Sequence, residues 1–282
     1  MPRRLRGFAT ILVIAALVAG CGAGATTPPG ATSTDGAGAA ASSAPAAPLT
    51  IFGAASLKAA LGRIKVAWEA TNPGSTLTIS TDSSAALETQ IEQGAPADVF
   101  LSADTSNPKK LTDASLTDGP AVDFAGNVLT IVVPPGNPAN IESPADVARP
   151  GVKIIAAGDD VPISKYARQV VAKLAKVAAA PPGFEAAYAA NVISKEDNVK
   201  AVIAKIELGE GDAGIVYGTD AKASTRVSTI AIPADVNVPA TYAGIVVKGS
   251  AHPTVAHAFL GWLAGADGQA VLRTFGFLPP PD

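Results

Sequence analysis

The segment Leu49-Thr50-Ile51-Phe52-Gly53-Ala54-Ala55-Ser56-Leu57 sets the pattern for the folded part of the chain. Its first four residues predict a buried strand. From Leu57 to Trp68, apolar residues recur at spacings of four, three and four, which predicts an amphipathic helix. Ser56 stands where a helix N-cap belongs. A strand followed directly by a helix is the unit from which α/β folds are built.

The same alternation continues to the C-terminus. Further strands are expected at 75–81, 97–102, 127–133, 152–157, 213–217, 228–232 and 242–247. Further helices are expected at 85–93, 164–179, 199–208 and from Pro253 onward. Repeated strand–helix–strand units predict an α/β fold whose sheets are mostly parallel. In such sheets, ligands lie beyond the carboxyl ends of the strands, next to helix N-termini.

Residues 1–20 have the composition of a secretory signal peptide. Three arginines precede an apolar run of about 12 residues, which is short of the roughly 20 residues that span a bilayer as a helix. Small residues then lead to Cys21, and this segment resembles the lipobox of bacterial lipoproteins. The resemblance implies cleavage before Cys21 and lipid attachment to it. An ordinary signal peptide and an uncleaved anchor are the alternatives.

Residues 21–48 are expected to form a tether that is not folded. From 22 to 48, every residue except Asp35 is Ala, Gly, Ser, Thr or Pro, a composition that cannot bury a core. The folded part is therefore expected to start at Leu49. Cys21 is the only cysteine, so no internal disulfide can form and stability must come from the core.

The charge balance excludes a nucleic-acid partner. Without the three arginines of residues 1–20, 18 basic residues face 24 acidic ones, and no basic patch is available to follow a phosphate backbone. An anionic ligand would therefore have to be held by local hydrogen-bond donors. Two candidate donor groups are Ser56 and the run Asp82-Ser83-Ser84, each between an expected strand and an expected helix. Each serine taken singly is better explained as an ordinary N-cap, whereas the two groups together suggest two helix N-termini that face one space.

Four ordered segments resemble the molybdate-binding proteins of ABC importers, and the likeness covers about 49–282. The first combines Ala54-Ala55-Ser56-Leu57 with Gly94-Ala95-Pro96-Ala97-Asp98-Val99-Phe100. The others are Val161-Pro162-Ile163-Ser164-Lys165-Tyr166-Ala167, Gly214-Ile215-Val216-Tyr217-Gly218-Thr219-Asp220-Ala221 and Phe275-Gly276-Phe277. The resemblance implies a two-lobed periplasmic-binding-protein fold of type II, with a mostly parallel, helix-flanked sheet in each lobe. Lobe 1 would comprise 49–131 plus 243–282 and lobe 2 would comprise 132–242, joined by two crossover strands.

The resemblance also implies a set of neutral ligands for the oxyanion. Side-chain hydroxyls would come from Ser56, Ser84 and Tyr217, and backbone N–H groups from Ser56, Ile163 and Val199. Three further candidates are Ser83, Ser164 and Asn198. Asn198 could replace Val199 as the contact, and Ser164 stands where the family usually has glycine. Lys58 and Lys165 lie beside these motifs and are expected at the surface.

The implied function is capture of molybdate or tungstate and delivery to an ABC transporter permease with its ATPase. The protein would be a monomer, lipid-anchored at the outer face of the cell membrane, and would be neither an enzyme nor dependent on a cofactor. No metal would be coordinated directly by side chains, because molybdate is held through its oxygens. A binding protein for sulfate or phosphate is the first alternative. A secreted serine hydrolase would need a base near Ser56 or Ser84, and a ferric binder would need paired tyrosines.

Overall fold

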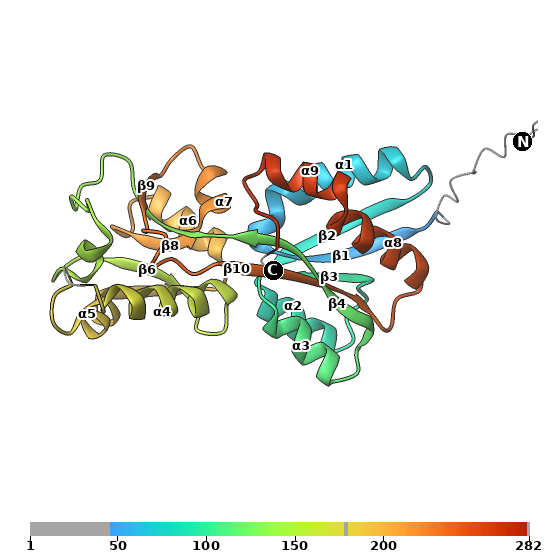
Figure 1. The fold of residues 1–282 in the computed structure, drawn as a ribbon, viewed down its shortest axis with the longest axis horizontal. Helices are drawn as coiled ribbons and strands as arrows, with labels where there is room; N and C mark the ends of the chain where they lie inside the picture. The colour runs from blue at the N-terminus through green and yellow to red at the C-terminus, as the bar shows by residue number, and fades with distance from the viewer. Residues whose placement is uncertain (1–45, 178–179, 281–282) are drawn as a thin grey trace, which may run out of the picture. The chain divides into compact units, whose positions relative to one another are not determined.

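The computed structural model describes residues 46–177 and 180–280 and is drawn in Figure 1. The expected signal peptide, Cys21 and residues 22–45 of the expected tether lie outside the described residues. The first strand begins at Pro48, one residue before the expected start, and Ala47 is already buried. Within the described ranges, no helix has both the length and the apolar character needed to cross a membrane.

The elements alternate along the chain much as the sequence predicts. The strands are β1 (Pro48–Ala54), β2 (Thr76–Asp82), β3 (Val99–Ser102), β4 (Thr117–Asn127), β5 (Leu129–Val133), β6 (Ile154–Ala157), β7 (Val192–Glu196), β8 (Gly214–Tyr217), β9 (Ser228–Ala231) and β10 (Ala240–Val247). The helices are α1 (Lys58–Thr71), α2 (Ser84–Glu92), α3 (Ser106–Asp113), α4 (Pro162–Leu174), α5 (Phe184–Asn191), α6 (Val199–Glu207), α7 (Gly218–Lys222), α8 (Pro253–Ala264) and α9 (Ala266–Thr274). Two 3₁₀ turns are η1 (Ala55–Leu57) and η2 (Pro144–Ala148).

A five-stranded sheet in the order β2-β1-β3-β10-β4 is covered by helices on both faces. Figure 1 shows α1, α8 and α9 on one side of this sheet and α2 and α3 on the other. Alternate residues of one strand enter separate cores, because side chains of a strand point to opposite faces. Ile51 of β1 packs in the core under α1, whereas its neighbour Phe52 packs with Leu87 and Leu111 under α2 and α3.

A second group of strands carries the other half of the fold. β8, β5 and β9 form a three-stranded sheet, and β6 and β7 form a parallel pair. A parallel bridge between Ile154 and Ala213 connects β6 to the residue preceding β8. Sheet membership of the chain changes at Val128, between β4 and β5, and again between β9 and β10. The predicted division into two lobes at 131/132 and 242/243 stays a prediction.

The α/β class with helix-flanked sheets is confirmed, but the sheets are mixed rather than mostly parallel. Among the described strands, β1–β2, β1–β3 and β6–β7 pair in parallel. The four pairings made by β10 and β5 are antiparallel. Each of these two strands lies between neighbours that run in the opposite direction. The apolar pattern of a segment does not show the direction of the strand in its sheet, so the sequence could not predict these antiparallel pairings. No expectation covered β4, β7, α3, α5, α7 or α9.

Candidate functional site

Three α-helices begin around one small cavity. They are α2, α4 and α6, and the cavity is closed by the end of β1, the turn η1, the residue after β3 and the end of β8. The lining residues are Ala54, Ala55, Ser56, Ser83, Ser84, Ala103, Val161, Pro162, Ile163, Asn198, Val199 and Tyr217. The structure thus brings together all five principal candidates from the sequence, although they span more than half of the chain.

The serine pair at the start of α2 has hydrogen-bond donors to spare. Ser83 is the N-cap, and its Oγ accepts the N–H of Ala86 at 3.2 Å. The Oγ of Ser84, which is 1% exposed, accepts the N–H of Ala103 at 3.0 Å. Each hydroxyl oxygen is therefore occupied as an acceptor, and each hydroxyl hydrogen remains available to donate. These two hydroxyl donors have no acceptor among the described residues, so they favour a ligand whose polar atoms only accept hydrogen bonds.

Ser56 differs from its expected role as an N-cap. It lies inside η1, whose N-cap is Ala54, and no side chain caps this turn. Its Oγ instead lies 2.9 Å from the phenolic oxygen of Tyr242. The chain enters α1 through a 3₁₀ turn, so the serine points sideways into the cavity rather than back along the helix. A Cβ on Gly53 would collide with the side chain of Leu61. Glycine at this position therefore allows α1 to pack on β1.

Asn127 and Tyr242 extend the contact of Ser56 into a chain of hydrogen bonds. The amide nitrogen of Asn127 donates to Thr219 at 2.8 Å and to the phenolic oxygen of Tyr242 at 3.3 Å. Tyr242 accepts from Asn127 and keeps its own O–H free to donate to Ser56, and that arrangement leaves the Ser56 O–H available to the cavity. Sequence reasoning missed both residues. The available signal was a tyrosine in a buried strand, since a buried phenol usually needs a polar partner.

Tyr217 carries a buried donor that has no hydrogen-bond partner within the described part of the chain. Tyr217 is 1% exposed and lines the cavity, and its hydroxyl is buried. Burial raises the pKa of this phenol well above its ordinary value, and the neighbouring Tyr242 acts in the same direction. The hydroxyl is therefore protonated at neutral pH. A buried donor left unsatisfied costs free energy, so this group indicates a ligand atom that accepts a hydrogen bond.

Backbone N–H groups complete the donor set. Pro162 occupies the first turn of α4 and Ile163 follows it, while Val199 is the first residue of α6. First-turn N–H groups have no intrahelical acceptor and lie at the positive end of the helix dipole. These helices have 13 and 9 residues, and α2 also has 9. Three helix N-termini at one cavity form a strongly anion-attracting arrangement.

The remaining candidates are used elsewhere. Ser164 lies beside Ile163, but its Oγ donates to the carbonyl of Ala157 at 2.8 Å, so its side chain does not reach the cavity. Asn198 lines the cavity and caps α6 by accepting the N–H groups of Lys200 and Ala201. Its Nδ2 donates to Asp82 at 3.1 Å. Lys165, expected at the surface, is half-buried and contacts Asp104, whereas Lys58 is exposed as expected.

The chemistry of the cavity disfavours two of the alternatives. Neither histidine of the chain lines it: His257 is exposed beside Asp118, and His252 precedes α8. The serines therefore have no general base of the kind that nucleophilic catalysis requires. Tyr217 and Tyr242 do pair, with ring centroids 5.6 Å apart. Burial raises the pKa of both phenols well above the ordinary value, which opposes the phenolate form that a ferric ion binds.

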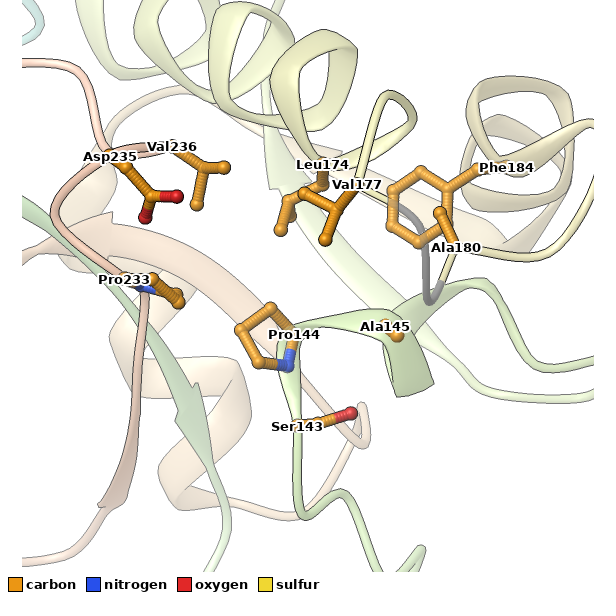
Figure 2. A pocket seen from close by; sticks show the side chains of 10 residues that line it. All are labelled: Ser143, Pro144, Ala145, Leu174, Val177, Ala180, Phe184, Pro233, Asp235 and Val236. Carbon is orange, nitrogen blue, oxygen red and sulfur yellow. The ribbon is translucent and has the colours of Figure 1, made fainter.

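A larger hollow elsewhere on the protein has a different character. Figure 2 shows that apolar side chains from α4, α5 and the segment before β10 surround it, among them Leu174, Phe184 and Val236. Of its lining residues, only Ser143 and Asp235 have polar side chains. A carboxylate and a single hydroxyl among apolar groups do not suit an anion. The small cavity of neutral donors remains the candidate site.

The architecture is that of the periplasmic binding proteins. The periplasmic molybdate-binding protein of Azotobacter vinelandii superposes with a TM-score of 0.70 at 22% identity, covering 83% of this chain and all of that chain. The sulfate-binding protein SubI of Mycobacterium tuberculosis gives 0.74 at 22% identity, covering 82% of this chain and 86% of that one. At these identities, the likeness defines the fold alone. Fold and cavity together define a solute-binding protein.

Residues 49–278 match the family of bacterial extracellular solute-binding proteins, and the chain belongs to this family of binding proteins rather than to an enzyme family. Among its relatives, the molybdate-binding protein ModA of Mycobacterium tuberculosis is 34% identical over 97% of this chain and 98% of its own length. The molybdate-binding protein ModA of Haemophilus influenzae is 32% identical over 86% of this chain and 94% of its own.

Proposed function

We propose that this protein captures molybdate or tungstate and delivers it to an ABC transporter permease driven by its ATPase. The observation that carries the proposal is the buried ring of neutral donors, with the phenol of Tyr217 unpaired among the described residues. The proposed ligands are the hydroxyls of Ser56, Ser84 and Tyr217 and the N–H groups of Ile163 and Val199, with Ser83 adjacent. The relatives named as molybdate-binding proteins support the same substrate class.

Neutral donors are well suited to a tetrahedral dianion. Hydrogen bonds to a charged acceptor are shorter and stronger than those between neutral groups, so several converging donors can replace the hydration shell. None of the twelve lining residues carries a formal charge. Selectivity against sulfate would then depend on size, because a ring of donors spaced for the larger ion leaves some of them underpaired around the smaller one.

The proposal includes export and anchoring. Residues 1–20 would be removed and Cys21 lipidated, so that residues 22–47 would tether a monomer at the outer face of the membrane, near its permease. A tether raises the effective concentration of a binding module at its target. Two lobes, comprising 49–131 plus 243–282 and 132–242, would close over the anion. The ligand stabilises the closed state only through the contacts that closure adds.

Thermal unfolding of the purified chain with molybdate, tungstate, sulfate or phosphate tests the substrate class. An anion at about 1,000 times its dissociation constant adds roughly 4 kcal/mol to the free energy of unfolding. For a folded unit of this size, the midpoint should rise by about 8–16 °C. We expect this rise with molybdate and tungstate and a much smaller one with sulfate. A rise with sulfate or phosphate alone would leave the fold intact and overturn the proposed specificity.

Affinity for the anion should be nearly independent of pH from about 6 to about 9, since an unperturbed tyrosine titrates near 10. Burial raises the pKa of Tyr217 further, so its hydroxyl keeps its proton and remains a donor throughout this range. No lining residue carries a carboxyl, imidazole or amine side chain that would titrate there. Isothermal titration calorimetry with molybdate at several pH values checks this expectation, and a loss of affinity between about pH 7 and 9 would contradict it.

A further inference from the structure

Two side-chain bridges flank the cavity without donating to its interior. The first joins Asp82, the last residue of β2, to Asn198, the N-cap of α6. The Nδ2 of Asn198 donates to the Oδ1 of Asp82 at 3.1 Å, and the same oxygen accepts the N–H of Ser83 at 2.7 Å. One amide therefore connects the start of α6, which presents Val199, to the start of α2, which presents the two serines.

The second bridge joins α4 to the segment after β3. The Nζ of Lys165 lies 3.1 Å from the Oδ2 of Asp104 and 2.6 Å from the Oγ of Ser106. Asp104 is 4% exposed, and its other oxygen accepts from Ser102 and Asn107. Burial alone would raise the pKa of this carboxyl, but hydrogen bonds from Ser106, Asn107 and Lys165 hold it below the ordinary value. The bridge is therefore ionic at neutral pH.

Both bridges connect the same two parts of the fold. Asp82 is the last residue of β2 and Asp104 follows β3, both strands of the five-stranded sheet, whereas α4 and α6 pack on the second group of strands. The donors of the cavity are divided in the same way, with the serines on one part and Ile163, Val199 and Tyr217 on the other. A movement that separates these two parts of the fold would break both bridges, and a movement that brings the parts together would form them.

We propose that Asp82–Asn198 and Asp104–Lys165 form a latch that stabilises the closed arrangement before the anion binds. The identity of the ligand in this inference rests on the proposed function, whereas the latch itself does not depend on it. Contacts that exist only in the closed state shift the population toward it, even in the absence of ligand. A larger closed fraction raises the apparent affinity, because less of the binding free energy is spent on closure. The latch residues thus set affinity mainly through the dissociation rate.

Two substitutions remove one bridge each while keeping the local structure. Asn198→Ser retains an oxygen that can cap α6, since serine is an equally good N-cap, and it removes the amide that reaches Asp82 without adding charge to the cavity. Lys165→Met retains an unbranched apolar stem, and Asp104 keeps its bonds from Ser102, Ser106 and Asn107. Lys109→Met is the matched control, because it removes an exposed ion pair with Asp113 inside α3.

Spin labels at Val66→Cys and Ile193→Cys, both exposed positions, report the separation of the two parts in a Cys21→Ala background. Without ligand, the parent should show a short-distance population that shrinks in Asn198→Ser and in Lys165→Met but not in Lys109→Met. With molybdate as the probe, each latch variant should release the anion about fivefold faster, the effect expected for one hydrogen bond. The association rate should change little.

The ligand-free distances separate the two proposals. If the parent binds no oxyanion, the proposed function fails, and the distance distributions still decide whether the latch exists. A parent with no closed population in the absence of ligand would overturn the latch. Distances and release rates equal to those of the parent in both latch variants would overturn it as well.

Discussion

Replacing Tyr217 by phenylalanine should weaken molybdate binding about 10- to 100-fold, the effect of removing one hydrogen bond to a charged acceptor. The phenol lines the cavity, is fully buried and has no partner among the described residues. The substitution keeps the ring and its tilted contact with Tyr242, so the packing of the cavity wall is preserved. Without ligand, the variant should unfold at the same temperature as the parent or slightly above it, because an unsatisfied buried donor has been removed.

Tyr166→Phe is the matched control for this experiment. Its ring lies 6.3 Å from that of Tyr217, but its hydroxyl accepts the N–H of Thr241 at 3.3 Å and is not part of the cavity. Isothermal titration calorimetry should therefore give nearly the parent affinity for Tyr166→Phe. Equal affinities for Tyr217→Phe and the parent would exclude the phenol as a ligand of the anion.

The periodic parts of the chain were predictable because their cause is local. The apolar spacing from Leu57 to Trp68 predicted α1, and its four periodic residues are all buried. The polar strand β4 gave no such signal. Its first half is largely exposed, and it becomes a strand because it pairs with β10. The strand conformation of β4 therefore depends on β10, which lies more than 110 residues away, and the residues of β4 alone do not predict it.

The candidate site, like the fold, was predictable only in part. Motifs located the residues that line the cavity, because each of them stands at a strand–helix junction. The motifs did not show how each side chain is used. Ser56 contacts Tyr242 across 186 residues, and Ser164 turns to the carbonyl of Ala157 although it lies beside Ile163. Such orientations follow from the packing of several elements. A pattern of residue types therefore predicts the members of a site better than it predicts their hydrogen bonds.

Replacing Lys200 by methionine should lower the free energy of unfolding by about 3 kcal/mol at neutral pH, as when a buried ion pair loses one partner. The Nζ of Lys200 lies 2.7 Å from the Oδ1 of Asp220, whose side chain is fully buried. Neither carboxylate oxygen makes another hydrogen bond within the described residues. Lys200 is adjacent to Val199, and Asp220 lies three residues after Tyr217. The ion pair therefore holds α6 against α7 behind the cavity.

The loss of stability in Lys200→Met should depend on pH, and the direction of this dependence identifies Asp220 as the cause. Burial raises the pKa of this carboxyl even with Lys200 present, and removal of the lysine leaves that effect unopposed. The folded state then holds a proton that the unfolded chain, titrating near 4, releases. Stability therefore falls as pH rises from the unfolded value to the folded one. Urea unfolding should show a smaller loss near pH 5 than near pH 7.

Two further variants make this prediction specific. Asp220→Asn in the Lys200→Met background removes the uncompensated charge and should restore most of the lost stability. Lys205→Met, on the same helix, breaks an ion pair with Glu196 that is partly exposed, so it should cost much less. If Lys200→Met and Lys205→Met were equally stable, or if the double variant recovered nothing, desolvation of Asp220 would not be the cause. A pair that behaves as predicted would show that the protein tolerates a buried charge directly behind a cavity built from neutral donors.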